Sequence, residues 1–155
     1  MSLARISRIA GLSSLVFALV LSVSGAARAD LAKWDQARVT SIAQQLVPAA
    51  QAWELAARQQ GPGTIGAAEE QGSLPMKART LREMSEGLAD HLAKGEGHDK
   101  TLDQYKSMRE VADDTEEMAQ RSELQAPTIA AWSKIADLLR QIAPYYDPKA
   151  LTGDK

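Results

Sequence analysis

Apolar residues recur every three or four positions in four stretches of the chain, which is the spacing of one face of an α-helix. The pattern predicts helices over residues 31–60, 74–94 and 101–122, and a fourth helix that starts near Pro127 and runs to Ala143. Polar residues fill the intervening positions, so each helix has one apolar face to bury. With short connections, these helices predict an all-α fold, a four-helix bundle that is mostly up-and-down.

Prolines and glycines set the predicted boundaries of the first two helices. Pro48 lies inside the first helix and removes one of its backbone hydrogen bonds, so we expect a kink or a break there. Residues 61–72 contain four glycines and one proline, which predicts a loop. Pro75 is expected in the first turn of the second helix, and Gly95 and Gly97 are expected to end it.

Two pairs of polar residues have the spacing of helix capping boxes. Thr101 with Gln104 predicts the start of the third helix, and Ser122 with Gln125 predicts the start of the fourth. Pro144 is expected to end the fourth helix. The polar residues 148–155 are expected to form a flexible tail.

The first 29 residues have the three parts of an export signal. Arg5 and Arg8 precede a mostly apolar stretch over residues 9–23, and Ala27-Arg28-Ala29 matches an A-x-A cleavage site. The apolar stretch is shorter than the ~20 residues that span a bilayer. We therefore predict a cleaved signal peptide over residues 1–29 and a helical bundle over 30–147. The predicted location is the periplasm, with secretion as the alternative and no membrane attachment after cleavage.

The composition of the chain after residue 29 excludes several classes of function. Its 15 basic and 20 acidic residues give a net charge of −5, which argues against a nucleic-acid partner. The chain has no cysteine, which excludes disulfides, thiolate metal sites, iron–sulfur clusters and thioether-bound haem. Leucine, isoleucine and valine are few and alanine is abundant, so Trp34, Trp53 and Trp132 are predicted to carry much of the core.

The two histidines and the methionines are the candidates for a soft-ligand site. His91 and Met84 share the predicted apolar face of the second helix, so both are candidate ligands of haem or a metal. The alternative is that His91 is a polar residue of the last helical turn, where it suits the helix dipole, and that methionine fills the core. His98 lies in the glycine-rich connection and is expected to be exposed to solvent.

Four carboxylates of the third predicted helix share one face: Glu110, Asp113, Asp114 and Glu117. They are candidate ligands of Ca²⁺ or another hard cation, or of a basic partner. Carboxylates on a rigid helix cannot wrap an ion as a loop does, and arginines lie four residues from two of them. The alternative is therefore an acidic face exposed to solvent.

The segment Leu88–Arg121 resembles the last two helices of cytochrome c-prime and related helical haem proteins. Those proteins have a helix, a short connection with glycine and aspartate, and then a helix with a Cys-x-x-Cys-His motif. Here Ala112, Thr115 and Glu116 occupy the positions of the two cysteines and the histidine. A second register, on the fourth predicted helix, fits equally well and places Leu139, Ile142 and Ala143 there. The resemblance implies a haemless four-helix bundle, with the fold retained and the haem absent.

No serine, histidine and aspartate of the chain have the sequence context of a nucleophile elbow or an equivalent motif. We therefore expect no enzymatic activity and no cofactor. The sequence predicts an exported helical-bundle protein that binds a protein partner or a ligand, and it leaves oligomerisation open. The alternative is a small-ligand binder, for haem b or a soft metal, that uses His91 and methionines.

Overall fold

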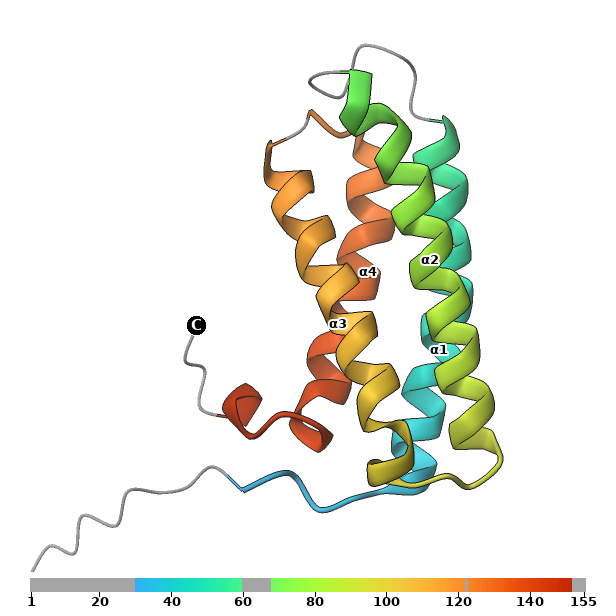
Figure 1. Ribbon diagram of the computed structural model, residues 1–155, viewed down its shortest axis with the longest axis vertical. Helices are drawn as coiled ribbons and strands as arrows, with labels where there is room; N and C mark the ends of the chain where they lie inside the picture. Colours follow the sequence, from blue (N-terminus) through green and yellow to red (C-terminus); the bar gives the residue numbers. More distant parts are fainter. Residues whose placement is uncertain (1–29, 60–67, 122, 152–155) are drawn as a thin grey trace, which may run out of the picture.

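The computed structural model describes residues 30–59, 68–121 and 123–151 (Figure 1). These ranges contain four helices, α1 (Gln36–Gln59), α2 (Ala68–Ala93), α3 (His98–Arg121) and α4 (Ala126–Ile142), and two short 3₁₀ helices, η1 (Ala143–Tyr145) and η2 (Pro148–Leu151). They contain no strand. The prediction of an all-α four-helix bundle is confirmed. None of the helices in these ranges is both long and apolar enough to cross a bilayer.

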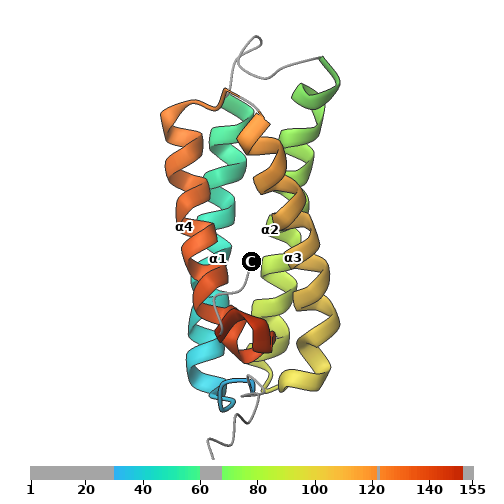
Figure 2. The ribbon, with the colours of Figure 1, turned by 90° about the vertical axis from the view of Figure 1, so that its left-hand side faces the viewer.

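Polar contacts place the start of α1, the end of α2, the start of α3 and the end of α4 together, at an end that we call the base (Figure 1). Gln36 at the start of α1 donates from Nε2 to the Leu92 carbonyl of α2 at 2.8 Å. The hydroxyls of Thr101 in α3 and Tyr146 after α4 are 2.7 Å apart. Consecutive helices therefore run in opposite directions. In Figure 2, α4 lies in front of α1 and α3 lies in front of α2.

The first helix begins five residues later than the sequence pattern predicts. The Asp35 carboxylate accepts a hydrogen bond from the Arg38 backbone N–H at 3.0 Å, and its carbonyl accepts the first helical bond, from Val39. Asp35 is thus the N-cap, and it satisfies backbone donors that a helix start leaves free. Residues 30–35 precede the helix as a segment at the base, which we call the N-terminal strap.

Helix α1 continues through Pro48 as one element, so the alternative of a break there is wrong. The missing proline N–H costs one backbone bond, and the helix on both sides is anchored by a buried face. Its buried residues are Val39, Ile42, Ala43, Leu46, Ala49, Ala50, Trp53, Glu54 and Ala57. The predicted kink stays a prediction.

Helix α2 begins six residues before the predicted start, so Pro75 lies inside the helix and not in its first turn. The predicted loop over 61–72 is therefore wrong from residue 68 onward, and residues 60–67 lie outside the described ranges. Residues 68–71 (AEEQ) all have good helix propensity, which outweighs the glycine that follows them.

Helix α2 ends as predicted, because Gly95 has a φ of 82°. This left-handed residue lets the Glu96 N–H bond the His91 carbonyl, as in a Schellman motif.

The predicted capping box at Thr101 is wrong, because α3 already begins at His98. The Thr101 hydroxyl lies within 3.1 Å of the Gly97 carbonyl and bonds Tyr146, while the Gln104 amide reaches the Met84 carbonyl of α2.

At the start of α4, Gln125 is the N-cap and makes no side-chain cap bond. Its predicted partner Ser122 lies outside the described ranges. Helix α4 stops before η1, which contains Pro144, and the first residues of the predicted tail form η2.

The apolar faces of the helices meet in one core. Its largest fully buried side chains include Trp53, Leu46, Leu74, Leu81, Leu88, Met108 and Ile135. Trp53 is 1 % exposed, whereas Trp34 and Trp132 are only partly buried at the edge of the core. The prediction that tryptophan carries the core therefore holds in full for Trp53 only.

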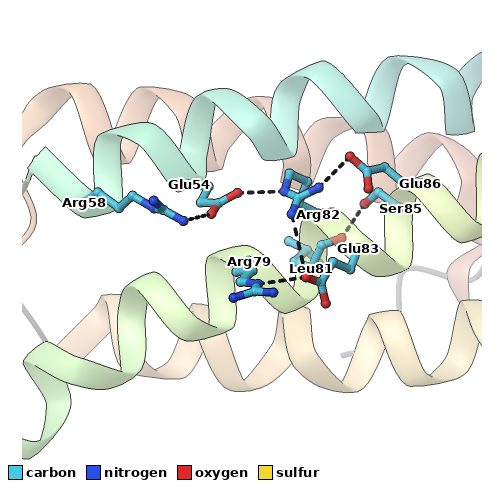
Figure 3. Close-up of polar contacts among 8 residues, drawn as sticks. All are labelled: Glu54, Arg58, Arg79, Leu81, Arg82, Glu83, Ser85 and Glu86. Carbon is cyan, nitrogen blue, oxygen red and sulfur yellow. Dashed lines mark hydrogen bonds and ion pairs between the residues drawn. The ribbon is translucent and has the colours of Figure 1, made fainter.

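A charged network joins α1 to α2 outside this core (Figure 3). Glu54 of α1 accepts hydrogen bonds from Arg58 on its own helix and from Arg82 of α2, the latter at 2.7 Å, and Arg82 also bonds Glu86. Burial alone raises the pKa of the Glu54 carboxyl, but the hydrogen bonds and charges of Arg82 and Arg58 outweigh burial and hold this pKa below its ordinary value. Glu54 is therefore an ionised clamp between the two helices.

Candidate functional site

His91 lies on the border of the predicted core face, and its side chain is 45 % exposed. Its Nδ1 lies 2.9 Å from a carboxylate oxygen of Glu96. Because a carboxylate only accepts hydrogen bonds, Nδ1 is the donor. His91 thus links the end of α2 to the connection that follows, as the last-turn alternative predicts.

The structure does not bring His91 and Met84 together. They are seven residues apart on one helix, which corresponds to about 10 Å along its axis. This is too far for two side chains to bind one metal ion directly. Met108 and Met118 are buried in the core, and Met76 is 69 % exposed, so the methionines lie in different environments.

The four acidic candidates of α3 have separate surroundings. Asp113 pairs with Arg109 on its own helix, and Asp114 lies 3.1 Å from the Lys77 ammonium of α2. Glu110 is exposed, and Glu117 also has an interaction partner. Across the described ranges, no three histidine or carboxylate side chains are placed to hold one metal ion.

The base contains an aromatic cluster that the sequence analysis missed. Tyr146 stacks on Tyr105, with ring centroids 4.3 Å apart, and on His98 at 5.5 Å, and Trp34 meets Tyr146 edge-on at 5.5 Å. The expectation that His98 is solvent-exposed is wrong, because its side chain is 25 % exposed. Burial raises the pKa of Tyr105 to about 12, so this phenol stays neutral at physiological pH.

His98 has one satisfied and one unsatisfied ring nitrogen. Nδ1 donates to the Asp99 carboxylate at 2.7 Å, and Nε2 is buried without a hydrogen-bond partner among the described residues. The ring stacks on Tyr146, and Trp34 covers its edge. The aromatic packing of the cluster closes the base, and a ligand would have to displace it to reach Nε2.

A groove lies between α3 and α4, and we call it the α3–α4 groove. Its half nearer the base has a volume of about 340 Å³ and is lined by Arg109, Ala112, Glu116, Trp132, Ala136, Leu139 and Arg140. Its other half has a volume of about 280 Å³ and is lined by Glu116, Ala119, Gln120, Leu124, Ile129 and Trp132. Glu116 and Trp132 belong to both halves, so the two form one continuous surface.

The groove exists because α3 and α4 do not approach each other closely and several of the residues that line the space between them are small. Helix α1 packs closely against α2 and α4, and α2 packs closely against α3, whereas α3 and α4 have no such close approach. Ala112 and Ala119 on α3 face the same opening as Ala136 on α4. A methyl group fills little of the space between two helices, so the floor of the groove stays open.

Trp132 forms the centre of the groove wall and connects it to the core. Its ring lies 5.1 Å from that of Trp53, at an interplanar angle of 51°. Trp53 is buried, and its indole N–H has no hydrogen-bond partner in the described chain. One side of Trp132 is thus held by the core, while the groove leaves other parts of the ring accessible.

Apolar groups dominate the groove, and a few charges lie at its edges. Arg109 pairs with Asp113, and Arg140 pairs with Asp137. The Glu116 carboxylate is exposed and has no hydrogen bond or ion pair to another residue of the described chain. A concave, mostly apolar surface with a few polar groups is the usual form of a small-ligand site.

Comparison of the chain with known protein families, curated proteins and solved structures finds no match. The resemblance of Leu88–Arg121 to cytochrome c-prime therefore stays a prediction from the sequence.

Proposed function

We propose that this chain is an exported, non-enzymatic binding protein that holds a small ligand in the α3–α4 groove. The observation that carries the proposal is the groove itself, which opens onto the core beside a half-buried tryptophan. The two halves have volumes of about 340 and 280 Å³, and together they lie within the range of common small-ligand sites. The export signal over residues 1–29 supports a periplasmic location, with secretion as the alternative.

Two further observations support binding rather than catalysis. The polar groups of the groove are two arginines already paired with carboxylates, one exposed glutamate and one glutamine. None of these is a nucleophile held by an adjacent base, which covalent catalysis needs. The alternative of haem or a soft metal at His91 gains no support from geometry, because His91 pairs with Glu96 away from Met84.

The experiment fills the groove without removing any core side chain. Ala136→Met places a longer side chain into the groove, and Ala130→Met makes the same change at an exposed position of α4 outside it. A panel of small amphiphilic molecules is tested for a rise in the melting temperature of the mature chain. We expect that some compounds raise the melting temperature of the wild type and of Ala130→Met, and that the same compounds do not raise that of Ala136→Met. Equal stabilisation of both variants contradicts the proposal.

A further inference from the structure

We infer that the α3–α4 groove selects an organic cation with an apolar body, such as an alkylammonium compound. The inference rests on the proposed function and names the chemistry of its ligand. It follows from three features of the groove: an apolar wall, a carboxylate without a partner, and an accessible tryptophan ring. The three features meet because Glu116 and Trp132 line both halves of the groove.

The half of the groove away from the base supplies the apolar wall. Leu124, Ile129 and Ala119 line it beside Trp132, and Ile129 is 49 % exposed although it is a large aliphatic residue. An alkyl or aryl group that covers Ile129 removes apolar surface from water, which favours binding in proportion to the area covered. Among the residues whose side chains the structure describes, none that lines this half is basic.

The charges of the groove determine which head group it prefers. Each arginine of the half nearer the base has a carboxylate partner within one turn of its own helix, Asp113 for Arg109 and Asp137 for Arg140. Glu116 has no such partner in the described chain, so its charge remains available. The uncompensated charge of the groove is thus negative, and it attracts a cation.

Trp132 also favours binding of a cation. The face of an indole ring is electron-rich and attracts an ammonium group that lies over it. Contact with Trp53 at 5.1 Å holds the Trp132 ring in place, so little side-chain freedom is lost on binding. Aromatic rings are the recurring recognition element for quaternary ammonium ligands, and here the Glu116 carboxylate lines the same groove.

The test compares three probes that share an eight-carbon chain: octyltrimethylammonium, 1-octanol and octanoate. Binding to the purified mature chain is measured by calorimetry at low ionic strength and below the concentrations at which the probes aggregate. We expect the cation to bind about 5- to 30-fold more tightly than the alcohol, and octanoate more weakly than the alcohol. The preference should fall as salt is added, since salt screens exposed charges.

Glu116→Gln is the diagnostic variant, and Glu110→Gln is its matched control on an exposed position of α3 outside the groove. We expect Glu116→Gln to reduce the affinity for the cation about fivefold and to leave the affinity for 1-octanol unchanged. Glu110→Gln should bind all three probes as the wild type does. Because both glutamates are exposed, neither change is expected to impair folding.

The outcomes separate the inference from the proposed function. If the three probes bind equally, or if octanoate binds best, the groove binds ligands and the inference of a cation is wrong. If none of the probes binds and no compound of the Ala136→Met experiment does, the proposed function itself is wrong. If the cation is preferred but Glu116→Gln and Glu110→Gln behave alike, the preference does not come from Glu116 and the inference is overturned.

Discussion

Trp53 and Trp132 touch each other, yet they differ in exposure, so their removal should have different costs. Trp53→Ala deletes a fully buried side chain, for which we expect a loss of about 3–5 kcal/mol in the free energy of unfolding. Trp132→Ala deletes a side chain that the groove already exposes in part, for which we expect about 2 kcal/mol. Chemical denaturation of both variants measures the difference. Equal losses would mean that the groove is closed in solution.

Glu54 should make stability depend on pH in the acidic range. Its pKa is lower in the folded than in the unfolded chain, so the unfolded chain binds more protons and the stabilisation is complete above the ordinary value of 4.5. As the pH falls from 4.5 through the lower folded pKa, this stabilisation is lost. We expect Glu54→Gln to be less stable than the wild type at neutral pH and to lose less stability on acidification.

Glu83→Gln is the control for this measurement, because Glu83 pairs with Arg79, and at 3.7 Å with Arg82, but is 51 % exposed. Exposed pairs contribute little to stability. Denaturation curves at a series of pH values should therefore show the wild-type profile for Glu83→Gln. A profile of Glu54→Gln that matches the wild type would show that the Glu54 clamp does not contribute to acid stability.

The two histidines show what residue patterns can and cannot predict. The alternative of a last-turn residue for His91 could be derived from its position, because helix ends depend on nearby residues. The burial of His98 could not, because it depends on Trp34 and Tyr146, which lie far from it in the sequence. Local spacing contains no information on which distant aromatic residues will meet at the base.

At the scale of the elements, the end of α2 depends on the backbone of one residue. Gly95 has a φ of 82°, and a Cβ added there would meet no other atom within 4 Å. Gly95→Ala should therefore cost about 1–2 kcal/mol through backbone strain alone. Gly97→Ala, two residues on, also has open space and no left-handed φ, so we expect a smaller loss. Thermal melting of the two variants checks this, and equal losses would refute the role of the Gly95 backbone.

The number, order and approximate extent of the helices could be predicted, because each has a buried face with helical spacing. The helix starts were predicted less well than the ends. Asp35 was overlooked as a cap because Leu31 and Trp34 continue the apolar spacing before it, although they belong to the N-terminal strap. Thr101 has the spacing of a capping box with Gln104, but its hydroxyl bonds Tyr146 and its predicted partner faces α2.

At the scale of the whole molecule, the α3–α4 groove could not be predicted from the sequence. Helical spacing shows that Ala112 and Trp132 lie on apolar faces, but it does not show which helices face each other. The groove arises because α1 packs between α2 and α4 and leaves α3 and α4 apart. Ala112, Ala119, Ala136 and Glu116 line a common surface only because the helices are arranged in this way.

The N-terminal strap connects the predicted processing of the chain to its stability. We predict cleavage between Ala29 and Asp30, and mass spectrometry of the exported protein should find Asp30 at the N-terminus. The strap then begins at the new terminus. The Ala32 N–H donates to the Pro144 carbonyl at 2.8 Å, and the Trp34 ring packs edge-on against Tyr145, Tyr146 and His98. Recovery of chains that retain Met1 in the membrane fraction would contradict cleavage.

A chain that begins at Asp35 tests the strap itself, because it keeps the N-cap of α1 and lacks only the segment before it. The lost Trp34 packing and the Ala32 hydrogen bond correspond to about 2 kcal/mol, so the melting temperature should fall by about 5–10 °C. Trp34→Ala in the chain from Asp30 should cause about half of this fall, since one backbone hydrogen bond contributes about 1 kcal/mol of the total. If the chain from Asp35 and the Trp34→Ala variant both have the melting temperature of the unaltered chain from Asp30, the strap does not hold the base together. The aromatic stack of Tyr105, His98 and Tyr146 would then be stable without its Trp34 cover.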